Sequence, residues 1–234
     1  MSVEVVDVAA FDGRVLPGEL AIGEGERAEA QRYWAARVAE NPRLFDGRVL
    51  LAESIDLSSG RLEARFREAP YSTFLWLRAG GAPGRQLGNV FSAAAVVTAD
   101  GAVLLGRMAP HTATAGQMYF PAGTPDLEDI AGDVVDLEGS LARELMEETG
   151  LGAPLVRPTD ERFVVVDGFL YACIRRFDTD LDAAALARVV ERNLAAEEEP
   201  ELDRAVLVRS AQDLTAMSPV YVHAAIAHLL KDAR

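Results

Sequence analysis

The sequence predicts an α/β protein, and three features of the pattern indicate that class. A continuous apolar run at residues 90–98 is typical of a strand buried on both faces of a sheet. From residue 88 onward, short strand-like runs alternate with longer segments of helical periodicity. Residues 136–149 have the clearest helical pattern, because Asp136 can cap the N-terminus and Gly150 can end the last turn. This alternation favours a sheet covered by helices.

The first part of the chain, residues 1–87, is expected to be an N-terminal extension that packs on the core. Valines that alternate with acidic residues predict its first strand, and Asp-Gly and Pro-Gly pairs predict the turns that follow. Asn41-Pro42 should stop its only long helix. The elements expected in order are a strand at 3–8, turns at 12–13 and 17–18, a helix at 23–40, a hairpin with strands at 49–52 and 62–66, and a short helix or covering segment at 71–77.

Residues 88–234 are expected to form the main domain. Its buried strand is followed by a tight turn at Ala99-Asp100-Gly101, which predicts a hairpin. Its closing helix is expected to start at Pro219, since proline is favoured in the first helical turn. The elements expected in order are strands at 90–98, 102–106 and 118–120, a helix at 136–149, strands at 162–167 and 169–177, a helix at 181–196, a strand at 205–208 and a helix at 219–231.

Composition narrows the classes of partner. Of the 234 residues, 50% are hydrophobic, which suffices for a sizeable core. The net charge of -14 argues against binding to nucleic acid and to anionic membranes, both of which need a basic surface. Binding of a small phosphorylated ligand remains compatible with this charge. Cys173 is the only cysteine, and the N-terminus has no basic segment followed by an apolar one, so we expect a cytoplasmic protein.

The helix expected at 136–149 gathers negative charge on one face. Glu147 and Glu148 follow Glu144 by three and four positions, which places all three side chains on the same side of the helix. Like charges at this spacing destabilise a helix unless a countercharge is present. Carboxylate oxygens suit hard divalent cations, so the pattern predicts a site for Mg²⁺ or Mn²⁺. The alternative is a solvated acidic face with no ligand.

From Arg143 to Leu151 the chain resembles the Nudix hydrolases, whose signature is G-x5-E-x7-R-E-U-x-E-E-x-G-U, with U aliphatic. The second half of this signature matches at every defined position. The first half does not, because Val135 stands where the family has glutamate and Asp129 where it has glycine. The Phe-Pro-Gly-Gly segment of the family is similar to residues 120–123, which implies a lengthened loop before the helix.

The resemblance implies an α/β/α sandwich with a mixed sheet, and a hydrolase that cleaves the diphosphate of a small nucleoside diphosphate derivative. It implies that Glu147 and Glu148, followed by Glu144, are the metal ligands, and that Arg143 orients Glu147. A backbone carbonyl of Gly123 or its neighbour Ala122 is a further expected ligand. In place of the missing glutamate we expect Asp133, Asp136 or Glu138, or else fewer metal ions.

The resemblance also implies a general base, either a glutamate of the helix or an acid from a loop near the C-terminus. Glu198 and Glu201 are the acids expected for the second role, although a solvated charge run is the alternative. For contact with substrate we expect Arg107, His111 and Phe120; a surface salt bridge for Arg107 and simple exposure for His111 are the alternatives.

Three functions remain open. Residues 34–37 and 41–47 resemble the Nudix branch that cleaves UDP-sugars, although core packing of Trp34 and Phe45 would explain the same residues. Leu104-Leu105-Gly106-Arg107 partly resembles a motif of coenzyme A diphosphatases. The third is a Nudix-like binding protein without turnover, suggested by Val135. The sequence also leaves open whether the protein is a monomer or a homodimer.

Overall fold

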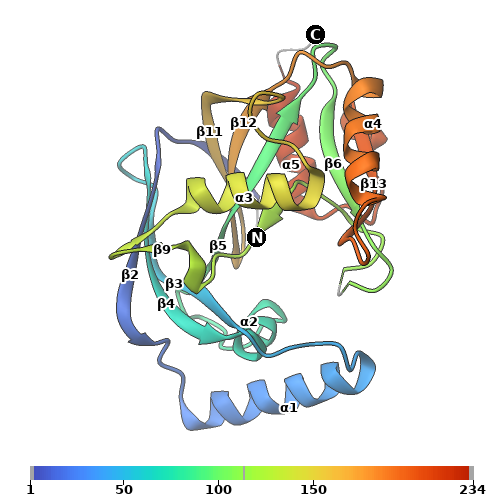
Figure 1. The fold of residues 1–234 in the computed structure, drawn as a ribbon. Coiled ribbons are helices and arrows are strands. Elements are labelled where there is room, and N and C mark those ends of the chain that lie inside the picture. The colour runs from blue at the N-terminus through green and yellow to red at the C-terminus, as the bar shows by residue number, and fades with distance from the viewer. Residues whose placement is uncertain (1–2, 113, 232–234) are drawn as a thin grey trace.

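A computed structural model describes residues 3–112 and 114–231, and its larger sheet holds strands from almost the whole chain (Figure 1). Strands β12 and β5 of this sheet are parallel, and the other pairs are antiparallel, so the sheet is mixed as expected. Its strand order is β1 (Glu4–Asp7), β11 (Arg157–Asp167), β12 (Leu170–Asp178), β5 (Asn89–Val97), β6 (Val103–Met108) and β13 (Leu202–Val208), with β7 (Met118–Tyr119) on β6 and β8 (Ala122–Gly123) on β5.

Helices cover both faces of the larger sheet. Strand β5 divides its side chains between them, since Phe91 and Ala93 pack with α5 (Val220–Leu229), whereas Ala94 and Val96 pack with α3 (Leu137–Thr149) and α4 (Ala183–Leu194). This is the predicted α/β/α sandwich. The strand is buried along nearly all its length, as its apolar run indicated.

A second sheet carries the remaining helices. Its order is β3 (Arg48–Asp56), β4 (Leu62–Pro70), β2 (Phe11–Glu19), β10 (Val134–Val135) and β9 (Ile130–Ala131). Leu50 and Phe66 on one face pack toward the larger sheet, and Val49 and Leu51 on the other pack with α1 (Glu24–Glu40) and α2 (Tyr71–Arg78). Two short 3-10 helices, Leu127–Asp129 and Ala211–Asp213, complete the fold.

Strands from each side of the expected domain boundary at residue 87 pair with strands from the other side. Strand β1 comes from the N-terminal extension but pairs with β11 at the edge of the larger sheet. Strands β9 and β10 come from the loop before α3, yet β10 pairs with β2 in the second sheet. The long loop before α3 is therefore ordered by the extension, and the two regions are joined by backbone hydrogen bonds.

The prediction of turns at 12–13 and 17–18 is wrong, because both residue pairs lie within strand β2. A side chain at Gly13 would place its Cβ 2.8 Å from the carbonyl oxygen of Val135, so glycine is needed where β10 packs on β2. Gly18 has φ of 86°, at a shift in the β2–β4 register between Val15 and Glu19. Tertiary pairing thus turned local turn signals into an irregular strand.

Helix α3 begins and ends where the sequence predicted. The Asp136 side chain accepts a hydrogen bond from the Gly139 backbone, and Gly150 closes the helix in the left-handed region at φ 69°. Figure 1 shows α3 between the part of the molecule that carries α4 and α5 and the part that carries α1 and α2. Within the described residues, no helix is long and apolar enough to cross a membrane.

Candidate active site

The acidic face of α3 turns away from the apolar core. Leu141 and Leu145 are buried against the larger sheet, whereas Glu147 is exposed. Glu144 and Glu148 lie between these extremes, with 19% of the Glu144 side chain exposed. The amphipathic spacing therefore presents the three carboxylates along one border of the helix, as predicted.

The backbone of β8 lies directly against this face. A Cβ added to Gly123 would stand 2.3 Å from Oε1 of Glu144, so the absence of a side chain at this position lets the carboxylate reach the strand. A hydrogen bond with the backbone of Ala122 favours the ionised form of Glu148. Gly123 pairs in register with Ser92 of β5, which fixes the depth of β8 beneath the helix. The expected neighbours of the metal site are therefore adjacent.

Burial makes the ionised forms of two of these acids unfavourable. Burial raises the pKa of Glu144 to about 7; Arg143 opposes the shift, while Glu147 and Glu201 add to it. Burial also raises the pKa of Glu148 well above its usual value, reinforced by the charges of Glu144 and Glu201. Two partly buried carboxylates with raised pKa values form a site that a nearby positive charge would stabilise.

Glu201 is the acid that the C-terminal loop brings to α3. Its negative charge acts on both Glu144 and Glu148, and its backbone carbonyl accepts a hydrogen bond from Ala109 at 2.8 Å just before β13. Glu198 and Glu201 are both exposed, and neither side chain makes a hydrogen bond or ion pair with any described residue. Of the two acids that the sequence suggested, Glu201 is the one whose charge acts on Glu144 and Glu148.

Arg143 does not pair with Glu147, as the sequence suggested, but with Asp129. Its Nη2 lies 2.9 Å from Oδ1 of Asp129 and 3.4 Å from Oε1 of Glu144. The Asp129 side chain is only 3% exposed and also accepts a hydrogen bond from the backbone of Asp126 at 3.0 Å. Sequence spacing missed this partner, because a count of fixed positions assigned Asp129 to the place of a glycine.

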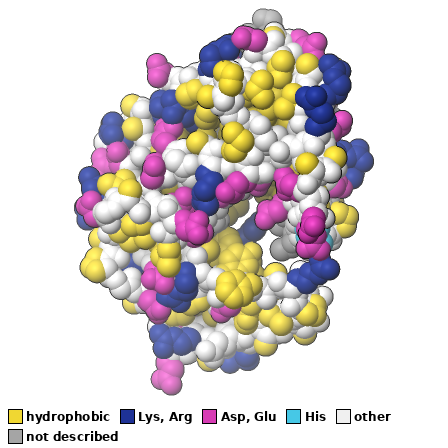
Figure 2. Space-filling model, viewed as in Figure 1, with side chains coloured by type: hydrophobic (Ala, Val, Ile, Leu, Met, Phe, Trp, Pro, Cys, Tyr) yellow, Lys and Arg dark blue, Asp and Glu magenta, His cyan; other side chains and the backbone are white. Residues whose placement is uncertain are grey.

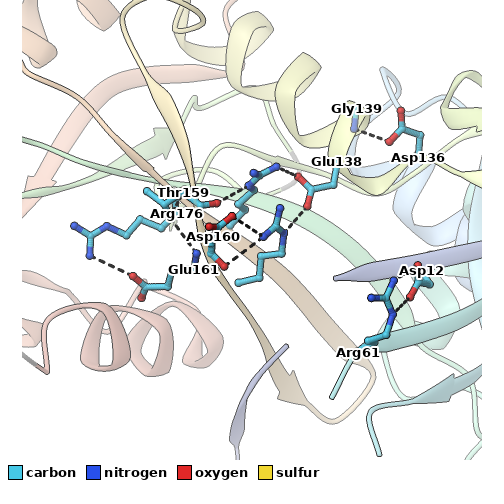
Figure 3. A network of polar contacts seen from close by, with 11 residues as sticks. Asp12, Arg61, Asp136, Glu138, Gly139, Thr159, Asp160, Glu161 and Arg176 are labelled. Carbon is cyan, nitrogen blue, oxygen red and sulfur yellow. Dashed lines mark hydrogen bonds and ion pairs between the residues drawn. The ribbon is translucent and has the colours of Figure 1, made fainter. Parts of the chain in front are cut away.

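The residues counted as replacements for the missing glutamate have other contacts. Val135 is buried in the core between the second sheet and α3. Asp133 pairs with Arg14 on the surface, and Asp136 caps α3. Glu138 points to β11 and β12, where it pairs with Arg162 at 2.7 Å and with Arg175; Figure 3 shows this network beside Gly139 and Asp136. It anchors the first turn of α3 on the sheet.

Two of the three residues expected to contact substrate have structural contacts instead. Arg107 forms a two-point ion pair with Asp203, at 2.7 Å and 2.5 Å, which agrees with the salt-bridge alternative. The Phe120 side chain is 1% exposed and packs within the core, so its contact with substrate stays a prediction. His111 is exposed in the loop after β6. Its contact with substrate stays a prediction.

The N-terminal extension forms the opposite side of a hollow below α3. Figure 2 shows this hollow, with acidic side chains along its upper edge and hydrophobic side chains below. Two contacts join the extension to the rest of the molecule: the Leu50 amide donates to the Pro125 carbonyl at 2.8 Å, and Arg43 pairs with Glu199 at 3.2 Å. Phe45, expected in the core, is 82% exposed beside this second connection.

The donor set fits a hard divalent cation in its chemistry. In the described part of the chain, no three acidic, histidine or cysteine side chains already converge as ligands of one ion. However, the acids of α3 supply only oxygen donors, and Gly123 leaves room for Glu144 against the β8 backbone. Oxygen ligands of this kind are those that Mg²⁺ and Mn²⁺ prefer.

Replacing Asp129 with asparagine is expected to lower the free energy of unfolding by about 1–3 kcal/mol, because the buried partner of Arg143 loses its charge. Chemical denaturation of the purified protein measures this. The matched control is Asp133→Asn in the same loop, whose side chain is 78% exposed and should change stability by less than about 0.5 kcal/mol. Equal stability of the two variants would show that the Asp129–Arg143 pair does not hold the loop on α3.

Comparison with known proteins gives one family match. The family profile described as NUDIX domain matches residues 88–223, which is more than half of the chain. No curated protein matches.

Solved structures are similar at low identity. One is a Nudix hydrolase from M. smegmatis, RenU, with 14% identity, 63% of this chain and 87% of that chain covered, and a TM-score of 0.40. Another is the MutT protein from Methanosarcina mazei Go1, with 18% identity, coverage of 62% and 94%, and a TM-score of 0.41. A third is the Bacillus subtilis pyrophosphohydrolase BsRppH, with 14% identity, coverage of 65% of this chain and 86% of that chain, and a TM-score of 0.34.

Proposed function

The chain belongs to the Nudix family, and we propose that it hydrolyses the diphosphate bond of a nucleoside diphosphate linked to another group. Family membership makes the protein a hydrolase of acid anhydrides in phosphorus-containing compounds. The observation that carries the finer proposal is the gathering of Glu144 and Glu148 beside the β8 backbone, where the charge of Glu201 also acts on both. A polar site of this kind, next to a hollow, suits a small anionic substrate once positive charge is present.

In this proposal Glu144, Glu147 and Glu148 hold Mg²⁺ or Mn²⁺, with the carbonyl of Gly123 as a further ligand. The bound cation would neutralise charge on the diphosphate and lower the pKa of a water molecule. Arg143, held by Asp129, keeps Glu144 in place through its second contact at 3.4 Å. Glu201 replaces Glu198 as the loop acid that accepts the proton of the attacking water.

The reaction balances without a further reactant. Water adds to one phosphorus atom, the bond from that phosphorus to the bridging oxygen breaks, and the two products each carry one phosphate. The proton released from water goes to a carboxylate, for which Glu201 is the proposed acceptor. Because this carboxylate lies near two others, a positive charge must offset their repulsion while substrate is bound.

A substrate panel tests the proposed function. Wild-type protein with Mg²⁺ or Mn²⁺ is incubated with UDP-sugars, ADP-ribose, NADH, coenzyme A and dinucleoside polyphosphates, and the products are identified by mass spectrometry. UDP-sugars come first, because residues 34–37 and 41–47 resemble that branch. The proposal predicts a nucleoside monophosphate as one product. Cleavage of coenzyme A alone would identify the second enzymatic candidate, and no cleavage of any compound would favour a binding protein.

Divalent cations are expected to raise the melting temperature. Binding to the folded state alone stabilises it by mass action, and here it would also relieve repulsion among the acids of α3. Melting curves in metal-free buffer and in millimolar Mg²⁺ or Mn²⁺ measure the shift, and a chelator should reverse it. An unchanged melting temperature with every ion would contradict a metal site formed by these residues.

A further inference from the structure

The last residue of α2, Arg78, contacts the larger sheet, although α2 belongs to the N-terminal extension. Arg78 Nη2 lies 3.4 Å from the hydroxyl of Tyr119 on β7, which in turn donates to Gln117 Oε1 at 2.6 Å. Strand β7 pairs with β6 in the larger sheet. The guanidinium of Arg78 therefore contacts the Nudix domain, although the backbone of Arg78 belongs to α2 in the N-terminal extension.

Two tyrosines are affected by Arg78 and by acids of the site. Burial raises the pKa of Tyr71; the charge of Arg78 opposes the shift, and that of Glu201 adds to it. Burial raises the pKa of Tyr221 well above its usual value; Arg78 opposes the shift, and Glu148 adds to it. The charges of Arg78 and of these acids thus act on the same two tyrosines, and Figure 1 shows α2, which ends at Arg78, on the side of the hollow opposite α3.

The hydroxyl of Tyr221 adds an independent observation. It is buried and has no hydrogen-bond partner among the described residues. The ring of Tyr221 lies 6.1 Å from that of Tyr119, which contacts Arg78. A buried hydroxyl without a partner is uncommon and indicates that a polar group is missing from its surroundings.

Arg78 also differs from three other arginines of the chain in lacking a carboxylate partner. Arg43, Arg107 and Arg143 each pair with a carboxylate. Within residues 3–112 and 114–231, Arg78 makes no ion pair, and its side chain is exposed. An unpaired guanidinium, in a protein with a net charge of -14, is suited to attract an anion.

We propose that Arg78 binds a phosphate group of the substrate across the hollow from α3, so that α2 forms part of the substrate site. This inference rests on the proposed function, because it assigns a contact to the same nucleoside diphosphate. The planar guanidinium can donate two parallel hydrogen bonds to phosphate oxygens. Tyr119 holds the guanidinium in place from β7. The extension thereby contributes to substrate affinity as well as to the fold.

Replacement of Arg78 tests this inference. Arg78→Ala is expected to raise KM by roughly 10- to 100-fold, the range for a lost hydrogen bond to a charged group, with a smaller change in kcat. Arg78→Lys should recover part of the affinity, because it restores the charge without the two-point geometry. The matched control is Arg32→Ala on the exposed surface of α1, which makes the same change in net charge and should leave KM unchanged.

A binding assay separates this inference from the proposed function. Calorimetry measures the affinity of wild type and variants for α,β-methylene ADP and α,β-methylene UDP, which resist cleavage. Weaker binding by Arg78→Ala supports the inference even where no substrate of the panel is cleaved. Normal hydrolysis together with KM and Kd values equal to those of Arg32→Ala would overturn the inference and leave the function standing. A wild type that neither cleaves nor binds would reject both.

Discussion

Replacing Glu148 with glutamine is expected to lower kcat by roughly 10²–10³-fold, the usual cost of removing one electrostatic contribution from an active site. Glutamine keeps the size and the helix propensity of glutamate and removes only its charge. Glu147→Gln is expected to have an effect of the same order, because both carboxylates belong to the proposed ligand set. Initial rates on a verified substrate at saturating metal measure both effects.

The substitution Glu148→Gln should leave the fold intact. Glu148 has a raised pKa in the folded protein, so its contribution to stability is present below its ordinary pKa and is lost as the pH rises. Glu148→Gln should therefore hold or raise the melting temperature near neutral pH in metal-free buffer. The control is Glu191→Gln on the exposed surface of α4, which should be near neutral. If Glu147→Gln and Glu148→Gln both kept the wild-type rate, the active site would have to lie elsewhere.

Gly123→Ala is expected to lower kcat by roughly 10- to 100-fold, since displacement of a reacting group by about 1 Å can cost that much. The new methyl group would stand 2.3 Å from Oε1 and 2.8 Å from Cγ of Glu144, so this side chain must move away from β8. Because the carboxylate ends a flexible side chain, the loss of stability should be small. Steady-state kinetics and melting curves of the same preparation separate the two effects.

Gly25→Ala is the matched control for this substitution. Gly25 lies in α1 with no atom within 4 Å of the added Cβ, so alanine should leave activity unchanged and improve the helix slightly. Equal kcat values for Gly123→Ala and Gly25→Ala would mean that the position of Glu144 against β8 does not matter for catalysis. The ligand set would then have to exclude Glu144.

The features that the sequence predicted well are those that depend on local chemistry. Asp136 and Gly150 mark the ends of α3 by capping, and the spacing of Glu144, Glu147 and Glu148 follows from the period of the helix. The buried strand β5 was recognisable because most of its residues are apolar. Each of these signals lies within about a dozen residues, and tertiary contacts reinforce each of them.

The features that the sequence did not predict depend on pairing between distant segments. Asp129 reaches Arg143 because the loop before α3 is longer than the family pattern and is held by pairing of β10 with β2. The strand at β2 replaced the expected turns for the same reason. Arg78 gave no signal at all, since only packing of the extension on the Nudix domain brings α2 to the hollow.

The central claim is that the carboxylates of α3 hold the divalent cation used in hydrolysis. Electron paramagnetic resonance of Mn²⁺ titrated with protein measures this directly, because free and bound ion give distinct signals. The account predicts saturable binding to wild type, clearly weaker binding to Glu148→Gln and to Glu147→Gln, and unchanged binding to Glu191→Gln. Mn²⁺ affinity that is the same in wild type and in both α3 variants would contradict it.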